Sequence, residues 1–217
     1  MMNENYYLQK IENIVSENLM SKLTLCHFKK DEYIVKQGQE LKCLYLLVKG
    51  RVKVCKTTAN GNTLLCNFTS ALSVIGEVEF FLNREINCDV ICNQDCILYT
   101  IDLLKDFQLV KEDPLLMNFL ATSMADKLYK SNYNASLSNN YPVINRLAAY
   151  LISCNQAGII QENFMTVSKM IGCSYRQLQR VLQQLCQKQY LLKHENGSYQ
   201  IINESALKQL GQEIYQL

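Results

Sequence analysis

The sequence predicts an α+β protein with an N-terminal antiparallel β-roll, a long helix and a C-terminal winged helix-turn-helix. Three observations lead to this prediction. Short β-branched and aromatic segments, punctuated by glycines, fill the first half of the chain. A single long helical pattern follows them. Two helical segments and a hairpin signal end the chain. The expected boundaries are 1–110 for the roll with its N-terminal helix, 111–138 for the long helix, and 139–217 for the winged helix-turn-helix.

The first block begins with an amphipathic helix, whose apolar face would comprise Leu8, Ile11, Val15 and Leu19. From His27 to Ile101 the apolar period changes to nearly two, which is typical of strands. The clearest expected strands are Tyr33–Val35, Leu44–Val48, Arg51–Cys55, Thr63–Phe68 and Cys88–Cys92.

The long helix is expected to begin at Asp113 and Pro114, with Asp as the N-cap and Pro at the first helical position. Its apolar stripe comprises Leu116, Phe119, Leu120, Ser123, Met124, Lys127 and Leu128. We expect this stripe to pack against a second copy of the helix and form a two-fold homodimer. Packing of the stripe on the roll alone is the alternative.

The segment 163–193 contains five Lys or Arg residues and no acidic residue, although the whole chain has a formal net charge of only +2. A helix beginning near Ser174 would bury Leu178, Val181, Leu182 and Leu185. A shorter helix over residues 164–171 precedes it and ends at Gly172, where the chain can turn. The outer face of the second helix would present Arg176, Gln179, Arg180 and Gln183. A helix-turn-helix with a basic outer face is typical of DNA binding, although a merely solvated helix is the alternative.

A hairpin is expected directly after this motif. Asn196-Gly197 separates the apolar runs 190–192 and 199–202, and it favours a type I′ turn with two positive φ angles. Such a hairpin would form a wing. Residues 1–140 carry 15 basic and 16 acidic side chains, whereas residues 141–217 carry 7 and 4, so the basic surplus lies in the second half.

Composition limits the function classes. With 48% apolar residues and two prolines, the chain should fold throughout, and no apolar run resembles a signal peptide or a membrane span. We therefore expect a cytoplasmic protein that contacts no membrane. The ten cysteines are then expected to be mostly buried free thiols. An enzyme is disfavoured, because His27 and His194 are the only histidines and no catalytic motif is present.

The order of roll, long helix and winged helix-turn-helix resembles the CRP/FNR superfamily of bacterial transcription regulators, and within it the YeiL type. The resemblance covers nearly the whole chain. In the first half it rests on Tyr33-Ile34-Val35-x-x-Gly38, Leu44 to Val54, Asn60-Gly61 and Ile75-Gly76-Glu77. In the second half it rests on Asn145 to Leu151, Ile171-Gly172-Cys173-Ser174, Ser174 to Leu178 and Arg180. The resemblance implies a cyclic-nucleotide-binding-like roll and double-stranded DNA as the partner of the second half.

The resemblance also implies roles for single residues. Ser174 corresponds to a residue that typically contacts phosphate, and Arg180 to an arginine that commonly binds guanine O6 and N7. Many members carry Arg then Glu where this chain has Tyr175 and Arg176. Because Arg176 can only donate, guanine or phosphate becomes its natural partner. The expected DNA-binding residues are Ser174, Tyr175, Arg176, Gln177, Gln179, Arg180 and Gln183.

The effector side departs further from the family. In cyclic-nucleotide-binding members a Gly-Glu pair precedes an Arg that holds the cyclic phosphate. Gly76 and Glu77 are present, but Asn87 and Cys88 stand at the positions of the Arg-Ser or Arg-Thr pair, and Arg84 comes too early. Without a guanidinium a buried phosphate would be poorly compensated, which argues against cyclic AMP. Leu72 also replaces a common turn glycine. The candidate ligand-pocket residues are Gly76, Glu77, Arg84, Asn87 and Cys88.

The cysteines offer a second sensing hypothesis. Cys88, Cys92 and Cys96 on one extended strand would span ~26 Å from first to last, so one metal or cluster could bridge them only if the strand breaks at Asn93-Gln94. The N-terminal cysteine cluster of iron–sulfur family members is absent, which argues against such a cluster. Cys43, Cys55 and Cys66 could converge as a thiol switch, with buried structural thiols as the alternative.

The sequence therefore predicts a homodimeric transcription regulator on a pseudo-palindromic DNA site, with half-sites about 34 Å apart. Its effector, whether a small molecule or a redox signal, and its cofactor are not given by the sequence. RNA polymerase is a further candidate partner. The alternatives are a thiol- or metal-based redox sensor of the same fold and an effector-independent DNA binder.

Overall fold

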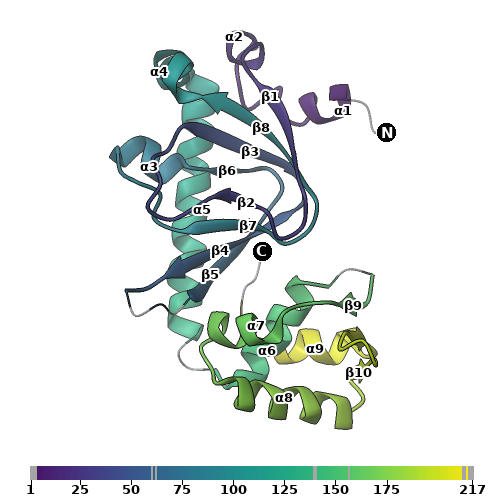
Figure 1. Cartoon of the computed structure of the whole chain (residues 1–217). Coiled ribbons are helices and arrows are strands. Elements are labelled where there is room, and N and C mark those ends of the chain that lie inside the picture. The colour runs from purple at the N-terminus through teal and green to yellow at the C-terminus, as the bar shows by residue number, and fades with distance from the viewer. Residues whose placement is uncertain are drawn as a thin grey trace. The chain divides into compact units, whose positions relative to one another are not determined.

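The computed structural model in Figure 1 describes residues 4–59, 61, 63–138, 141–155, 157–211 and 214. Its internal contacts divide the chain into two compact units, Met1–Lys56 with Cys66–Tyr129 and Thr57–Leu65 with Lys130–Leu217. Asn60, the first residue of the Asn60-Gly61 signature, lies outside the described residues. No helix in these described ranges is long and apolar enough to cross a membrane.

The first half folds into two four-stranded sheets, in the orders β1-β8-β3-β6 and β2-β7-β4-β5. The pairs β1–β8, β3–β8, β3–β6, β2–β7 and β4–β7 are all antiparallel. The strands are β1 (Thr24–Phe28), β2 (Tyr33–Val35), β3 (Cys43–Lys49), β4 (Arg51–Thr57), β5 (Thr63–Ser70), β6 (Ser73–Ile75), β7 (Asp89–Cys92) and β8 (Cys96–Asp102). All five strands named from the sequence are present, and β6 and most of β8 fall within the segment 27–101 that was expected to form strands, whereas β1 begins before it.

Alternation along the strands builds the core. On β3, Leu44, Leu46 and Val48 enter one hydrophobic cluster, whereas Leu47 points the other way into a second. Both faces of β3 are therefore buried, and this explains why its sequence is almost continuously apolar.

The N-terminal helix is interrupted, contrary to the sequence prediction. The structure has α1 (Glu4–Leu8) and α2 (Glu17–Met20), with turns between them. Ser16 ends the turn segment, because its hydroxyl oxygen accepts from the Leu19 amide at 3.4 Å and caps α2. The apolar spacing still predicted burial, since Ile11, Val15 and Leu19 all lie in the first core cluster.

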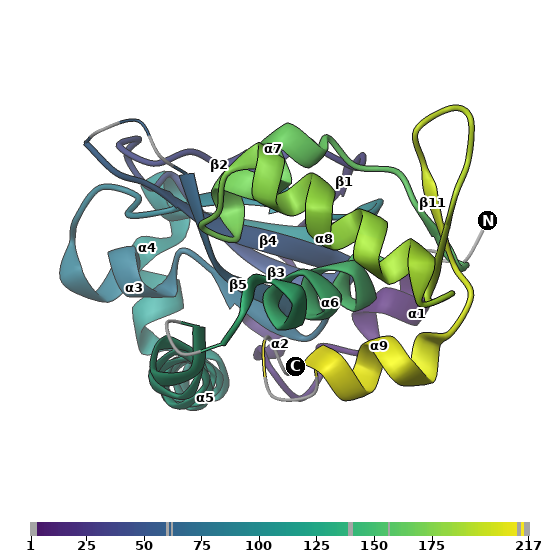
Figure 2. The same cartoon turned by 90° about the horizontal axis from the view of Figure 1, so that it is seen from below.

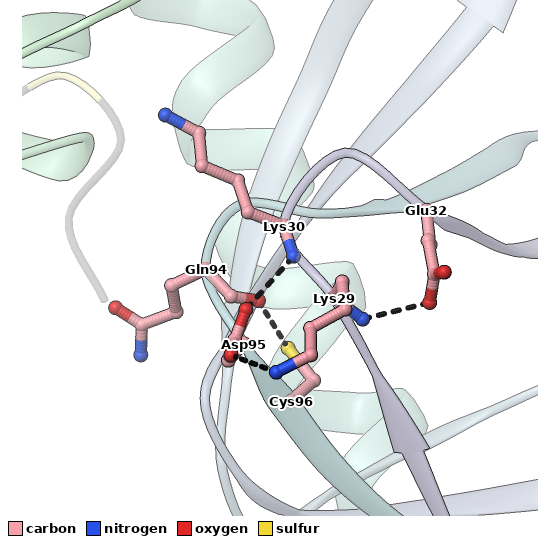
Figure 3. Close-up of polar contacts among 6 residues, drawn as sticks. All are labelled: Lys29, Lys30, Glu32, Gln94, Asp95 and Cys96. Atoms are coloured by element: carbon pink, nitrogen blue, oxygen red, sulfur yellow. Dashed lines mark hydrogen bonds and ion pairs between the residues drawn. The ribbon is translucent and has the colours of Figure 1, made fainter.

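The extended chain breaks between β7 and β8. Such a break was the condition for one metal or cluster to bridge Cys88, Cys92 and Cys96. Residues 93–95 form a corner, drawn in Figure 3, in which Asp95 accepts from the Lys29 ammonium at 2.9 Å and the Lys30 amide at 3.1 Å. The Cys96 thiol donates to the Gln94 carbonyl at 3.1 Å within the same corner. Cys88, Cys92 and Cys96 therefore do not follow one extended strand.

Three helices complete this half: α3 (Glu77–Leu82), α4 (Leu103–Glu112) and α5 (Pro114–Ser138). Asp113 caps α5 as expected, since its carboxylate accepts from the Leu116 amide at 2.9 Å. The predicted dimer stripe is only partly free, however. Leu116 and Leu120 are fully buried in the first core cluster of the roll. The stripe packs there because its early members lie directly opposite the apolar face of the roll, so this part of the prediction was wrong.

The second half contains α6 (Val143–Ser153), β9 (Ile159–Ile160), α7 (Phe164–Met170), α8 (Tyr175–Gln187), β10 (Leu191–Lys193), β11 (Tyr199–Ile201) and α9 (Glu204–Gly211). The strands form one antiparallel sheet in the order β10-β11-β9. Figure 2 shows α7 beside α8 and the hairpin of β10 and β11 extending from the end of α8. The close approach of α9 to α6 requires Gly211, because a Cβ there would lie 2.6 Å from the Ala149 nitrogen.

Candidate nucleic-acid interface

The recognition helix candidate is α8, and its start is fixed by local hydrogen bonds. Ser174 is its N-cap, with the hydroxyl oxygen accepting from the Gln177 amide at 3.2 Å. Gly172 adopts a positive φ of 68° in the turn from α7. The Arg146 guanidinium donates to the Ile171 carbonyl, which ties α6 to this turn. The two helices and their turn therefore form at the positions expected from the sequence.

The two faces of α8 differ as the spacing predicted. Leu178, Val181, Leu182 and Leu185 are buried. Six of the seven candidate DNA-binding residues are exposed, namely Ser174, Tyr175, Arg176, Gln177, Arg180 and Gln183, and Gln179 is half-buried. This face carries two guanidinium groups and no carboxylate. It can donate hydrogen bonds to phosphate oxygens and to guanine.

The wing forms as an antiparallel hairpin, with Leu191 opposite Ile201 and Lys193 opposite Tyr199. Its turn differs from the sequence prediction. Gly197 has a φ of 82°, but Asn196 has no positive φ, so the turn is not type I′. The Gly197 amide instead donates to the His194 carbonyl at 3.0 Å, which matches a type I turn followed by a left-handed glycine. The Asn196 side-chain oxygen accepts from the Ser198 amide at 3.0 Å and stabilises this loop.

The candidate ligand-pocket residues separate into two groups. Glu77 is only 3% exposed, and its carboxylate accepts from the Lys127 ammonium of α5 at 2.6 Å. Lys127 also donates to the Val74 carbonyl. Gly76, with a φ of 97°, precedes α3 and lies against Leu41. The family's glutamate is therefore present but already holds an internal cation.

Asn87 and Cys88 form the second group. The Lys56 ammonium donates to the Asn87 carbonyl and side-chain oxygens at 2.7 and 2.6 Å. The Asn87 amide donates to Glu79 at 3.0 Å. Arg84 is exposed in the loop after α3. The cation that contacts Glu77 is Lys127. A cavity of about 410 Å³ in the roll is lined by Ile34, Val35, Gln39, Glu40, Leu41, Lys42, Tyr45 and Ile86, and by none of the five candidates.

Lys127 and Lys56 were missed as members of these sites. Lys127 could have been found, because it lies seven residues after Leu120 on the helical face that buries Leu116. Of the three cysteines considered for a thiol switch, Cys55 on β4 and Cys66 on β5 lie on neighbouring strands and interact electrostatically. Cys43 lies on β3 in the other sheet and neighbours Cys26. Among the described residues no group of three or more His, Cys, Asp or Glu side chains could hold a metal ion.

Comparison with known proteins agrees with this architecture. A family model described as cyclic nucleotide-binding domain matches residues 25–113. The regulatory protein YeiL of Escherichia coli O157:H7 is 29% identical over 190 residues, covering 88% of this chain and 86% of that protein. The cAMP-activated global transcriptional regulator CRP of Pasteurella multocida is 23% identical over 185 residues, covering 79% and 88%. The structure of a CRP/FNR-family transcriptional regulator from Thermus thermophilus matches with a TM-score of 0.72 at 18% identity, covering 87% and 98%.

Proposed function

We propose that this chain is a transcription regulator of the CRP/FNR type that binds double-stranded DNA sequence-specifically as a homodimer. The proteins to which it is similar are regulators by name and not enzymes. The functional division we propose is a sensor roll over 1–110, a dimerisation helix over 111–138 and a DNA-binding domain over 139–217. We place the protein in the cytoplasm, where RNA polymerase would be its further partner.

One observation carries the DNA-binding proposal. The exposed face of α8 presents Arg176 and Arg180 beside glutamine amides, and no acidic residue lies in 163–193 to neutralise them. A basic face without carboxylates is the electrostatic footprint of a phosphate-bearing partner. Arg180 is the candidate for guanine recognition, and Ser174 and Arg176 are candidates for phosphate contacts.

The homodimer proposal rests on the face of α5 turned away from the roll. Asn118, Ala121, Ala125 and Leu128 recur at the three- and four-residue spacing of a coiled-coil seam, and all four are exposed. Leu128 is 63% exposed, which is unfavourable for a large apolar side chain in a monomer. Two small alanines would let a second copy of α5 approach closely, and the dimer would carry two recognition helices, one for each half-site.

A cyclic nucleotide does not fit the roll of this protein. Its ribose would need the Glu77 carboxylate, which Lys127 occupies, and its phosphate would need a guanidinium where Asn87 stands. The ion pair already joins α5 to the roll, which favours DNA binding without a nucleotide effector as the second hypothesis. We therefore expect cyclic AMP to leave both thermal stability and DNA affinity unchanged.

The DNA-binding proposal is tested by fluorescence anisotropy with mixed-sequence duplex DNA across a salt series. The logarithm of the affinity should fall linearly with the logarithm of the salt concentration, because bound phosphates release counterions. The double variant R176A/R180A should bind more weakly with a shallower slope. Lys208→Ala on α9 is the matched control, because Lys208 is exposed but pairs with Glu204 on its own helix. Equal losses in both variants, or salt-independent binding, would contradict the proposal.

A further inference from the structure

The cavity of about 410 Å³ in the roll lies where the loop 36–42 joins β2 to β3. Its apolar floor consists of Ile34, Val35 and Ile86, which are all buried. Tyr45 of β3 also lines the cavity and is half-buried. Small-molecule sites are mostly apolar and have volumes of about 300–1,000 Å³, so this cavity has the size and lining that suit a small ligand.

The mouth of the cavity, formed by Gln39, Glu40 and Lys42, carries one side chain of each charge. All three residues are exposed. Within the part of the chain that the structure describes, the side chains of Glu40 and Lys42 form no ion pair and no hydrogen bond. The Lys42 ammonium can therefore bind a ligand carboxylate, and the Glu40 carboxylate can bind a ligand ammonium.

Tyr45 supplies a neutral polar group to the same cavity. Its hydroxyl forms no hydrogen bond with another described residue. Burial raises the pKa of this phenol, so the hydroxyl stays protonated at neutral pH and can donate a hydrogen bond. A ligand that replaces water at this hydroxyl can keep the hydrogen bond while its apolar part leaves water.

Backbone hydrogen bonds hold the mouth in place. The Gly38 amide donates to the Ile86 carbonyl at 2.8 Å, and the Ile86 amide donates to the Gln39 carbonyl at 2.8 Å. At the other end of the loop, the Leu103 amide donates to the Lys42 carbonyl at 2.9 Å. Because both ends are fixed, a ligand would lose little affinity to ordering of the loop.

We propose that this cavity binds a hydrophobic α-amino acid as its zwitterion, with the side chain on the apolar floor, the carboxylate at Lys42 and the ammonium at Glu40. A ligand with a single charge would use only one of the two charged groups of the mouth. A free amino acid carries both charges next to an apolar body, and its size suits the cavity.

The cavity also borders the contact between the roll and α5. Leu41 lines the cavity, and its side chain fills the space in which a Cβ of Gly76 would lie. Gly76 precedes Glu77, whose carboxylate accepts from Lys127 of α5. A ligand that moves Leu41 would therefore act on this ion pair. This effector role rests on the proposed function, whereas binding of the amino acid does not.

The test is isothermal titration calorimetry of the full-length protein, without DNA, against L-leucine, L-isoleucine, L-methionine and L-phenylalanine. At least one should bind at one site per protomer and raise the midpoint of thermal unfolding. Three analogues dissect L-phenylalanine. Removal of the ammonium in 3-phenylpropionate or of the carboxylate in phenethylamine should weaken binding about 2- to 5-fold. Glycine, which lacks the apolar body, should bind at least about tenfold more weakly.

Variants locate the site. Lys42→Met and Glu40→Gln should each weaken binding about 2- to 5-fold, because both side chains are exposed. Tyr45→Phe removes only the hydroxyl and should weaken binding about 2- to 10-fold. Lys36→Met and Glu85→Gln are the matched controls, because both residues are exposed near the cavity without lining it. Both controls should bind like the wild type.

Absence of binding by all four amino acids would overturn the proposal. Equal affinity of L-phenylalanine and either singly charged analogue would overturn the assignment of a zwitterion. Equal losses in Lys36→Met and Lys42→Met would show that the ligand binds elsewhere. The ligand series on the wild-type protein decides the question even if a variant fails to fold. Since DNA is absent, failure to bind an amino acid leaves the DNA-binding proposal intact.

Discussion

The ion pair between Glu77 and Lys127 gives the sharpest stability prediction. At 2.6 Å and an effective dielectric constant of about 20, the gross attraction is about 6 kcal/mol. Desolvation of both groups offsets much of it. Removing one partner of a buried pair usually costs about 3–5 kcal/mol. Because the Lys127 side chain remains 28% exposed, we expect Lys127→Met to cost about 2–3 kcal/mol, below that range.

The cost should be asymmetric between the two partners. Lys127→Met leaves a buried carboxylate without its cation. Glu77→Gln leaves an ammonium that can still reach water and the Val74 carbonyl, so it should cost only about 1–2 kcal/mol. The double variant should cost less than the sum of the two single variants.

Urea unfolding followed by far-ultraviolet circular dichroism measures these costs at one fixed protein concentration, with 13 tyrosines and no tryptophan available as a second probe. Lys105→Met is the matched control, because Lys105 pairs with Asp102 on the surface with 79% of its side chain exposed. It should cost less than about 0.5 kcal/mol. Equal costs for Lys127→Met and Lys105→Met would refute the claim that the internal cation stabilises the roll.

Three further outcomes follow from the packing and the backbone. Leu72 adopts a φ of 62°, so Leu72→Gly should raise stability by about 0.5–1 kcal/mol in urea unfolding, and a loss would show that its side chain matters more than its backbone strain. Burial raises the pKa of the Asp113 carboxyl, but hydrogen bonds from Leu116 and Ser16 outweigh burial and hold this pKa below its usual range. The stability that this carboxylate adds is therefore complete above about pH 4 and is lost as pH falls through the lowered pKa. Asp113→Asn should cost about 1 kcal/mol at pH 7 and less in acid. A cost independent of pH would contradict this assignment. Leu128→Arg should shift the protein from dimer to monomer in sedimentation equilibrium, whereas Leu104→Arg on α4, 76% exposed, should not; equal behaviour would place the dimer contact elsewhere.

The elements that the sequence predicted well are those with a local cause. Ser174, Gly172 and the buried face of α8 are specified within fifteen residues, and the same holds for Asp113 at the start of α5. The alternating strands were also found, because burial on one face leaves a period of two in the sequence.

The missed features depend on contacts between distant residues. Lys127 and Glu77 are 50 positions apart, and only the fold brings them together. The break between α1 and α2 depends partly on Asp113, which accepts from the Ser16 amide at 3.0 Å across 97 positions. The backbone of Leu72 could not be predicted either, because leucine disfavours the left-handed conformation that the turn imposes on it.

Selection of genomic fragments by the purified protein at near-physiological salt tests the central claim most directly. The retained fragments are sequenced, with R176A/R180A as the parallel control. The account predicts enrichment of one two-fold symmetric site with half-sites about one helical turn apart, and loss of that enrichment in the control. Retention of fragments without a common site, or the same site retained by both proteins, would contradict recognition of DNA by α8.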